Sequence, residues 1–89
     1  MNAEEKISVL KINLQQLTDS NDAYLEKLLK HAESLMMREG IINDYTVDYD
    51  MAVIDYAAFL FRKRANSEMH MPRHLRCELN NILFSQKSK

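Results

Sequence analysis

Three side chains that can bind a metal ion stand close together near the C-terminal end of the chain. His70, His74 and Cys77 are four and three residues apart, a spacing that brings side chains to one face of a helix. A structural zinc site needs four ligands. Pro72 places His70 before the helix that follows, and a fourth ligand is missing. We therefore expect no metal site and interpret the three residues as a polar helix start with a half-buried thiol.

The sequence also lacks the motifs that support catalysis. It has no glycine-rich phosphate loop, no paired acidic motif with metal spacing and no serine or cysteine in a recognisable nucleophile setting. We expect a protein that is not an enzyme, with no catalytic residue and no cofactor. Asp55 is charged but lies in an apolar segment, where a carboxylate normally has a partner. We expect it to pair with an arginine or lysine.

That apolar segment is the most informative part of the chain. Ten of the eleven residues from Met51 to Phe61 are apolar, and the basic residues Arg62, Lys63 and Arg64 follow them. A helix that is apolar nearly all round must be covered on several sides, and this one is shorter than the roughly 20 apolar residues that span a bilayer. It is therefore either the centre of a tight helical domain or partly buried by another copy of the protein.

The second alternative defines a set of candidate partner-interface residues. Some apolar side chains of this helix would lie at a subunit boundary, and nearby basic side chains would contact a partner. The set is Met51, Val53, Tyr56, Phe59, Leu60, Arg62, Lys63, Arg64, Arg73 and Arg76. For the basic run there are two other interpretations: a solvated helix end that suits the helix dipole, and a contact with DNA, which usually needs more positive charge.

Composition predicts one all-α domain over residues 1–89. One glycine and one proline in 89 residues provide too few turns for an all-β fold. A single cysteine excludes an internal disulfide framework and suits a reducing compartment. The N-terminal residues MNAEEK do not resemble a signal peptide, so we expect a cytosolic product.

Apolar spacing predicts a small bundle of about four helices, with the third the most buried. The first spans about residues 3–17, and the polar cluster 18–21 precedes a second helix that Gly40 ends. Thr46, Asp48 and Asp50 are candidate caps for the third helix. Pro72 lies in the first turn of the fourth, and residues 86–89 are expected to fray. The predicted core contains Leu28, Leu29, Ala32, Ile54, Ala58 and Leu79.

The small net charge of −1 hides an uneven distribution. Residues 1–50 hold ten acidic and five basic side chains, whereas residues 51–89 hold three acidic and seven basic ones. A molecule with this polarity can dock to copies of itself or to an oppositely charged partner.

The order of these segments resembles the phage head-tail connector family, the gp6-like head-completion or DNA-packaging adaptors. The matching segments are VLKINL at residues 9–14, DAYLEKLLKHAESLM from Asp22, MAVIDYAAFLFRKRAN from Met51 and MPRHLRCELNNILF from Met71. The likeness covers nearly the whole chain. The chain differs from the family in the compact loop after Gly40 and in having no long C-terminal extension.

This resemblance implies a structural role in a phage or prophage particle. Subunits of such connectors form a closed ring beneath the portal protein, made in the bacterial cytoplasm and placed at the head-tail junction of the virion. The ring extends the DNA channel and docks tail or stopper proteins. Double-stranded DNA passes through without sequence-specific binding, and no membrane is involved. A closed ring uses heterologous contacts between unlike faces.

Two other classes of function remain open. In a DNA-binding regulator, the last two helices would form a helix-turn-helix with Arg73, Arg76, Asn80 and Asn81 facing a groove. Residues 66–71 are longer than the usual turn of that motif and lack its glycine. In a small helical adaptor, the apolar third helix would bind one partner protein. A ring, a DNA-binding dimer and a monomeric adaptor differ in hydrodynamic size.

Overall fold

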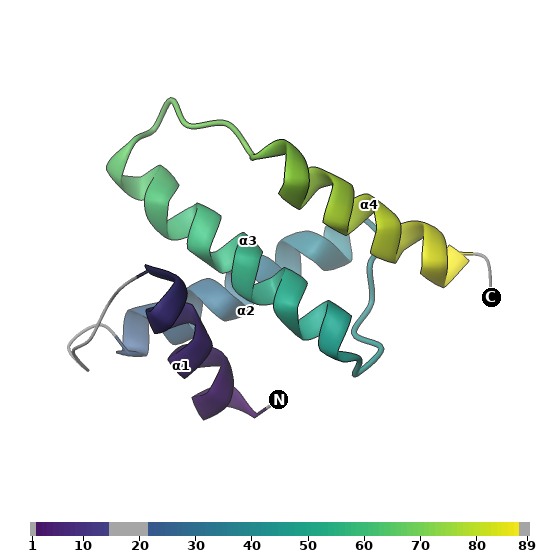
Figure 1. Cartoon of the computed structure of the whole chain (residues 1–89), viewed down its shortest axis with the longest axis horizontal. Helices are drawn as coiled ribbons and strands as arrows, with labels where there is room; N and C mark the ends of the chain where they lie inside the picture. The colour runs from purple at the N-terminus through teal and green to yellow at the C-terminus, as the bar shows by residue number, and fades with distance from the viewer. Residues whose placement is uncertain (1, 15–21, 88–89) are drawn as a thin grey trace.

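The computed structural model describes residues 2–14 and 22–87. These residues form four helices, α1 (Ala3–Leu14), α2 (Asp22–Arg38), α3 (Val47–Ala65) and α4 (Arg73–Lys87), and contain no strand. α3 lies at the centre and packs against each of the other three (Figure 1). The all-α bundle with a buried third helix that the sequence predicts is confirmed. None of the described helices is long and apolar enough to cross a bilayer.

The core gathers around the middle of α3. All six predicted core residues are buried, with Ala32, Ile54 and Leu79 fully enclosed. The buried side chains of α3 include Ala52, Ala57 and Ala58, and small residues let the neighbouring helices approach closely. α3 is therefore covered within a single chain, which corresponds to the first of the two alternatives for the apolar segment.

α2 ends at Gly40, as its sequence indicates. Gly40 has a φ of 95°, its N–H donates to the carbonyl of Met37, and the N–H of Ile41 donates to the carbonyl of Met36. This pair of hydrogen bonds is the Schellman motif, which a left-handed residue closes. Ile41 is fully buried, so the chain that leaves α2 is tied back to the core.

α3 begins after Thr46, one of its three candidate caps. The Oγ1 atom of Thr46 accepts a hydrogen bond from the backbone N of Tyr49 at 3.1 Å. Asp48 stays exposed in the first turn. Asp50 is buried and one of its oxygens lies 3.4 Å from Nζ of Lys6 on α1. The three polar residues therefore have three different roles.

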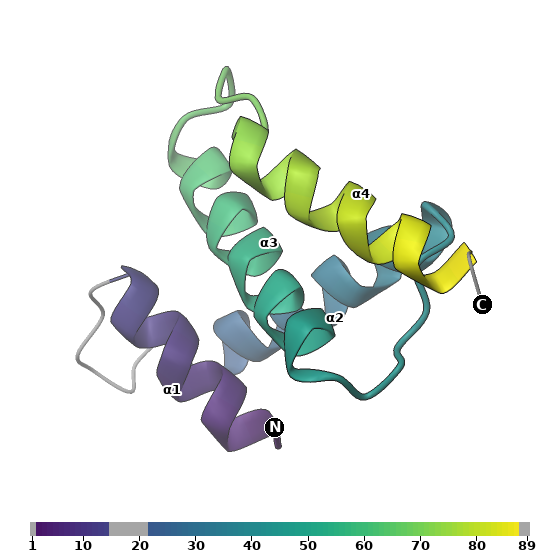
Figure 2. The ribbon, with the colours of Figure 1, turned by 45° about the vertical axis from the view of Figure 1, so that its right-hand side comes forward.

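α4 runs back alongside α3 (Figures 1 and 2) and continues further than predicted. Gln86 and Lys87 are helical, so the expectation that both would fray is wrong. The Gln86 side chain explains this order: it accepts from the N–H of Ile42 at 3.0 Å and donates to the carbonyl of Ile42 at 2.7 Å. The predicted end of the first helix at residues 15–17, the polar cluster 18–21 and residues 88–89 lie outside the described residues.

Candidate functional site

The structure corrects part of the candidate interface. Val53, Tyr56 and Phe59 are buried within the chain, because α1, α2 and α4 all pack against α3. They are core residues and leave almost no side-chain surface for a neighbour. Met51 and Leu60 are half-buried at the edge of the same core. The middle of α3 is therefore not the surface that a partner would meet.

The basic run lies at the C-terminal end of α3, where all three side chains are exposed. Arg62 donates from Nη2 to both the carbonyl and Oδ1 of Asn13 on α1, each at 3.1 Å. Nζ of Lys63 lies 5.8 Å from the ring centre of Phe59. We call these residues, Arg62, Lys63 and Arg64, the basic end of α3.

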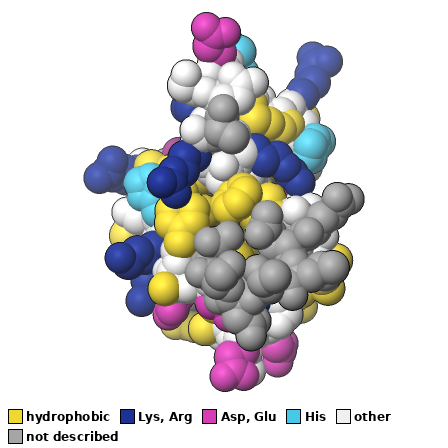
Figure 3. All heavy atoms as spheres, turned by 90° about the vertical axis from the view of Figure 1, so that its left-hand side faces the viewer, with side chains coloured by type: hydrophobic (Ala, Val, Ile, Leu, Met, Phe, Trp, Pro, Cys, Tyr) yellow, Lys and Arg dark blue, Asp and Glu magenta, His cyan; other side chains and the backbone are white. Residues whose placement is uncertain are grey.

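Aromatic side chains accompany the basic end. The guanidinium of Arg64 lies 4.9 Å from the ring centre of Tyr24 on α2, and Tyr24 packs on Phe61 with ring centres 6.2 Å apart. Both rings are half-buried. Figure 3 views this end of the molecule and shows Lys and Arg side chains around a group of hydrophobic ones. The surface therefore combines positive charge with accessible apolar area.

The two candidate arginines of α4 have different surroundings. Arg76 forms an ion pair with Glu39 at the end of α2, which links α4 to α2. Arg73 is exposed at the start of α4 and lines a cleft that the sequence analysis did not predict. The structure thus separates Arg73 and Arg76, one at an open surface and one in a contact between helices.

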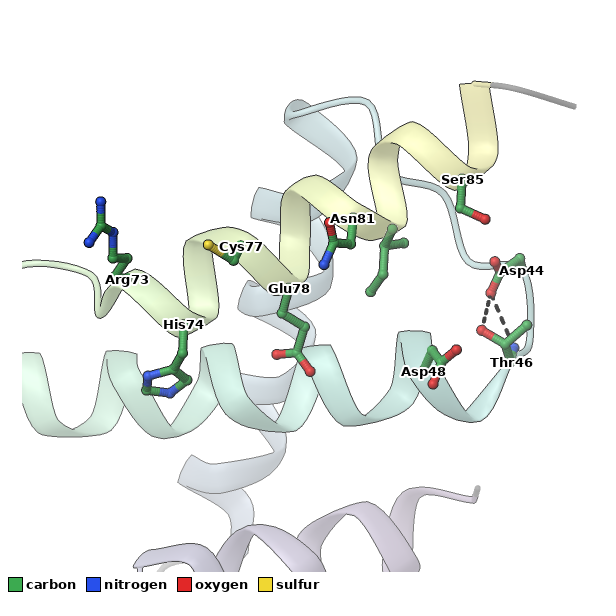
Figure 4. Close-up of a pocket in the computed structure, with 10 residues that line it drawn as sticks. Asp44, Thr46, Asp48, Arg73, His74, Cys77, Glu78, Asn81 and Ser85 are labelled. Atoms are coloured by element: carbon green, nitrogen blue, oxygen red, sulfur yellow. Dashed lines mark hydrogen bonds between the residues drawn. The ribbon is translucent and has the colours of Figure 1, made fainter.

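The cleft lies between α4 and the segment that leads into α3, and has a volume of about 980 Å³. Figure 4 shows Asp44 and Asp48 toward one end of it and Arg73 toward the other, with Glu78 between them. We call the part lined by Asp44, Asp48 and Glu78 the acidic half of the cleft. Besides these three residues and Arg73, the cleft is lined by Thr46, His74, Cys77, Asn81, Ile82 and Ser85.

The carboxyl group of Glu78, which lines this cleft, forms a hydrogen bond with the carboxyl group of Asp55. Burial of Glu78, a hydrogen bond with Asp55 and the charges of Asp55 and Asp48 raise the pKa of Glu78 to about 7. Oε1 of Glu78 is shielded from solvent and receives no hydrogen bond from a described donor. A proton held by the pair removes the repulsion between the two carboxyls and supplies the missing donor. Asp55 also accepts from Nδ2 of Asn13 at 3.5 Å.

Asp55 was expected to pair with a cation, and this expectation is wrong. Its described partners are the Asn13 amide and the Glu78 carboxyl. Arg62, the nearest candidate cation in the sequence, donates to Asn13 instead. The amide of Asn13 therefore stands between the positive and the negative side chain, an arrangement that helical spacing on α3 alone does not indicate.

The segment before α3 is a loop with internal hydrogen bonds and exposed apolar side chains. The Asp44 carboxylate accepts from the backbone N and from Oγ1 of Thr46, and these hydrogen bonds lower the pKa of Asp44. Tyr45 has a φ of 61°, which is unusual for a residue with a large side chain, and its side chain is 87% exposed. Ile42 and Val47 on either side are exposed as well.

His70, His74 and Cys77 are all exposed. His74 and Cys77 line the cleft, whereas His70 precedes α4. In residues 2–14 and 22–87, no three His, Cys, Asp or Glu side chains lie close enough together to hold a metal ion.

Comparison of the chain with protein-family models, with curated proteins and with solved structures finds no match. Its own residues and surfaces are therefore the basis for a functional proposal.

Proposed function

We propose that this protein is a structural subunit that assembles head to tail into a ring, as phage head-tail connectors do. One observation carries the proposal: the two ends of the central helix present unlike surfaces. The C-terminal end of α3 carries Arg62, Lys63 and Arg64, and its N-terminal end lies beside the acidic half of the cleft. Unlike faces suit heterologous contacts, and such contacts generate closed rings when their rotation closes.

The closed core supports a subunit that folds before it assembles. The middle of α3 is buried within one chain, so a neighbour is not needed to complete the fold. The exposed large apolar side chains are instead at the surface of other segments, namely Ile12, Met37, Ile42, Tyr45, Val47 and Phe84. Exposed aromatic and aliphatic side chains next to charged ones are the usual composition of a protein interface.

We propose that this ring lies at the head-tail junction of a phage or prophage particle, and the resemblance in segment order supports this. Its partners there are further copies of the chain, the portal protein, and tail or stopper proteins. Duplex DNA passes through the channel without being read. Arg73, exposed at the end of the cleft opposite Asp44 and Asp48 (Figure 4), is the remaining arginine of α4 that is available to such a partner.

Light scattering across a concentration series and a salt series tests the proposal. A ring subunit yields a species several times the 10.5 kDa of the chain, and it weakens as salt screens the charges. Gel shift with duplex DNA at low salt tests the regulator alternative. A dimer that retards DNA, or a monomer under all conditions, contradicts the ring.

A further inference from the structure

Asp48 in the acidic half of the cleft and Arg64 in the basic end of α3 cannot meet within one molecule. From Asp48 to Arg64 the helix rises about 24 Å at 1.5 Å per residue, whereas an ion pair requires about 4 Å or less. These two side chains therefore lie at opposite ends of one helix. A contact between them can form only between two molecules.

The acidic half of the cleft contains carboxylates that can bind a cation. Asp48 is exposed, and no described side chain pairs with it. Asp44 stays ionised because its hydrogen bonds with Thr46 lower its pKa. Arg73 lies at the far end of the cleft (Figure 4) and does not pair with these carboxylates. A cation from another molecule can therefore bind them.

Two exposed apolar residues, Tyr45 and Val47, which we call the apolar rim, adjoin the same carboxylates in the sequence. Tyr45 and Val47 alternate with Asp44, Thr46 and Asp48 along the chain and are 87% and 64% exposed. The Tyr45 backbone adopts a left-handed conformation that costs free energy for a residue with a Cβ atom. In the single chain the Tyr45 side chain is almost fully exposed, so burial does not offset this cost.

The basic end of α3 has the matching composition. Exposed Arg64 stands over the half-buried ring of Tyr24, which packs on Phe61. Exposed Lys63 lies over the ring of Phe59. Basic side chains lie next to hydrophobic ones on this face (Figure 3). The acidic half of the cleft, with its apolar rim, is therefore complementary to the basic end of α3, with its aromatic rings. Charge complementarity of this kind fixes the register of a contact and speeds association.

We propose that Lys63 and Arg64 of one subunit dock in the acidic half of the cleft of the next, with Tyr45 and Val47 of the receiving subunit packed on Tyr24 and Phe61. This contact rests on the proposed ring and names its two faces. A second copy is the fitting occupant because every subunit carries both faces. A nucleic acid is not, because its phosphates are repelled by Asp44 and Asp48.

Charge reversal with mutual rescue tests the contact. Asp48→Lys places a cation in the acidic half of the cleft, and the double substitution Lys63→Glu with Arg64→Glu places two carboxylates at the basic end of α3. Like charges brought together cost several kcal/mol, so each variant alone should assemble at least about tenfold more weakly than the wild type. A 1:1 mixture should regain assembly, because each lysine at position 48 then meets the glutamates of the other variant.

Matched controls separate the contact from general charge effects. Glu4→Lys reverses an exposed acid in the first turn of α1, the same helical setting as Asp48. Arg38→Glu reverses an exposed base in the last turn of α2, the same setting as Arg64. Both controls should assemble as the wild type does, and circular dichroism should show native helix content in every variant.

Cys77 provides a second measurement, because it is exposed and lines the cleft. Its alkylation by a maleimide should be slower in assembled wild type than in the Asp48→Lys variant, and should slow again in the mixture. Wild type that stays monomeric up to its solubility limit overturns the ring and the contact together. Wild type that assembles while the reversed variants also assemble, or while their mixture fails to recover, overturns the contact alone.

Discussion

The middle of α3 and its two ends obey different constraints. In the middle, Val53, Ile54 and Ala57 are fully enclosed by the chain's own helices. At the ends, charged and apolar side chains are exposed: Arg64 beside Tyr24 at one end, and Asp48 next to the exposed Tyr45 loop at the other. One helix therefore has a segment whose packing is complete and two segments whose packing is not.

This difference shows that an apolar sequence does not by itself mark a binding surface. The most apolar segment of the chain stabilises the single subunit. The surfaces left for a partner are mixed in composition, as in most interfaces, where charged residues form the rim. Substitutions in the middle of α3 should thus change folding, and substitutions at its ends should change association.

The largest expected effect is in the middle of the helix. Ile54→Ala removes a fully buried side chain and leaves a cavity, so it should lower the free energy of unfolding by about 2–5 kcal/mol. Ile12→Ala is the matched control, because Ile12 is 74% exposed, and it should change stability by no more than about 0.5 kcal/mol. Urea denaturation followed by circular dichroism measures both. Equal losses at the two sites would contradict the closed core.

Next in size is the pH dependence that Glu78 imposes. Its pKa is about 7 in the folded chain against 4.5 for the free side chain. Between these values the folded chain binds a proton that the unfolded chain does not, so stability should fall as pH rises from about 4.5 to about 7. Glu78→Gln should flatten this part of the profile and raise stability at pH 8.

The control for that profile is Glu26→Gln on the exposed face of α2. Glu26 lies 3.7 Å from Lys30 in an exposed pair, and such pairs contribute little, so the profile of this variant should follow the wild type. Thermal melts at closely spaced pH values provide the comparison. An unchanged profile in Glu78→Gln would mean that the carboxyl pair does not hold a proton in the folded chain.

A smaller effect, of opposite sign for folding and for assembly, is expected at Tyr45. Asparagine tolerates the left-handed backbone better than tyrosine, so Tyr45→Asn should stabilise the isolated subunit by up to about 1 kcal/mol. It should also weaken assembly, because the exposed ring that is proposed to pack on the neighbouring subunit is lost. Thermal melts and light scattering on one sample measure the two effects. Assembly as tight as that of the wild type would exclude Tyr45 from the contact.

The smallest effect on folding is expected at the basic end of α3. Replacing Arg62, Lys63 and Arg64 together by glutamine should change the free energy of unfolding by about 0.5 kcal/mol or less, since the three side chains are exposed. Assembly should weaken and lose its salt dependence. Full assembly, with the salt dependence retained, would make the basic run a solvated helix end.

Much of the fold follows from local signals in the sequence. Apolar spacing predicts the four helices, Gly40 ends α2 in the left-handed conformation, and Thr46 caps α3. The core also follows, because residues such as Leu28 and Leu79 repeat at helical spacing on faces that must be covered. These signals depend on neighbours a few residues away.

The cleft could not be predicted in the same way. It depends on how α4 lies against the start of α3, which brings Glu78 to Asp55 and Gln86 to Ile42. Helical spacing within one element does not specify such pairings. Glu78 carried one available signal, since it adjoins the buried Leu79 on a helix otherwise rich in basic and amide residues.

Native mass spectrometry of the wild-type protein tests the central claim, that unlike ends of α3 drive head-to-tail assembly. Heterologous contacts that close should yield one dominant species with more than two copies of the 10.5 kDa chain. That species should disappear in the Asp48→Lys variant and return when it is mixed with the variant that carries Glu at positions 63 and 64. A monomer, or a dimer that persists in both variants, would exclude head-to-tail assembly through the ends of α3.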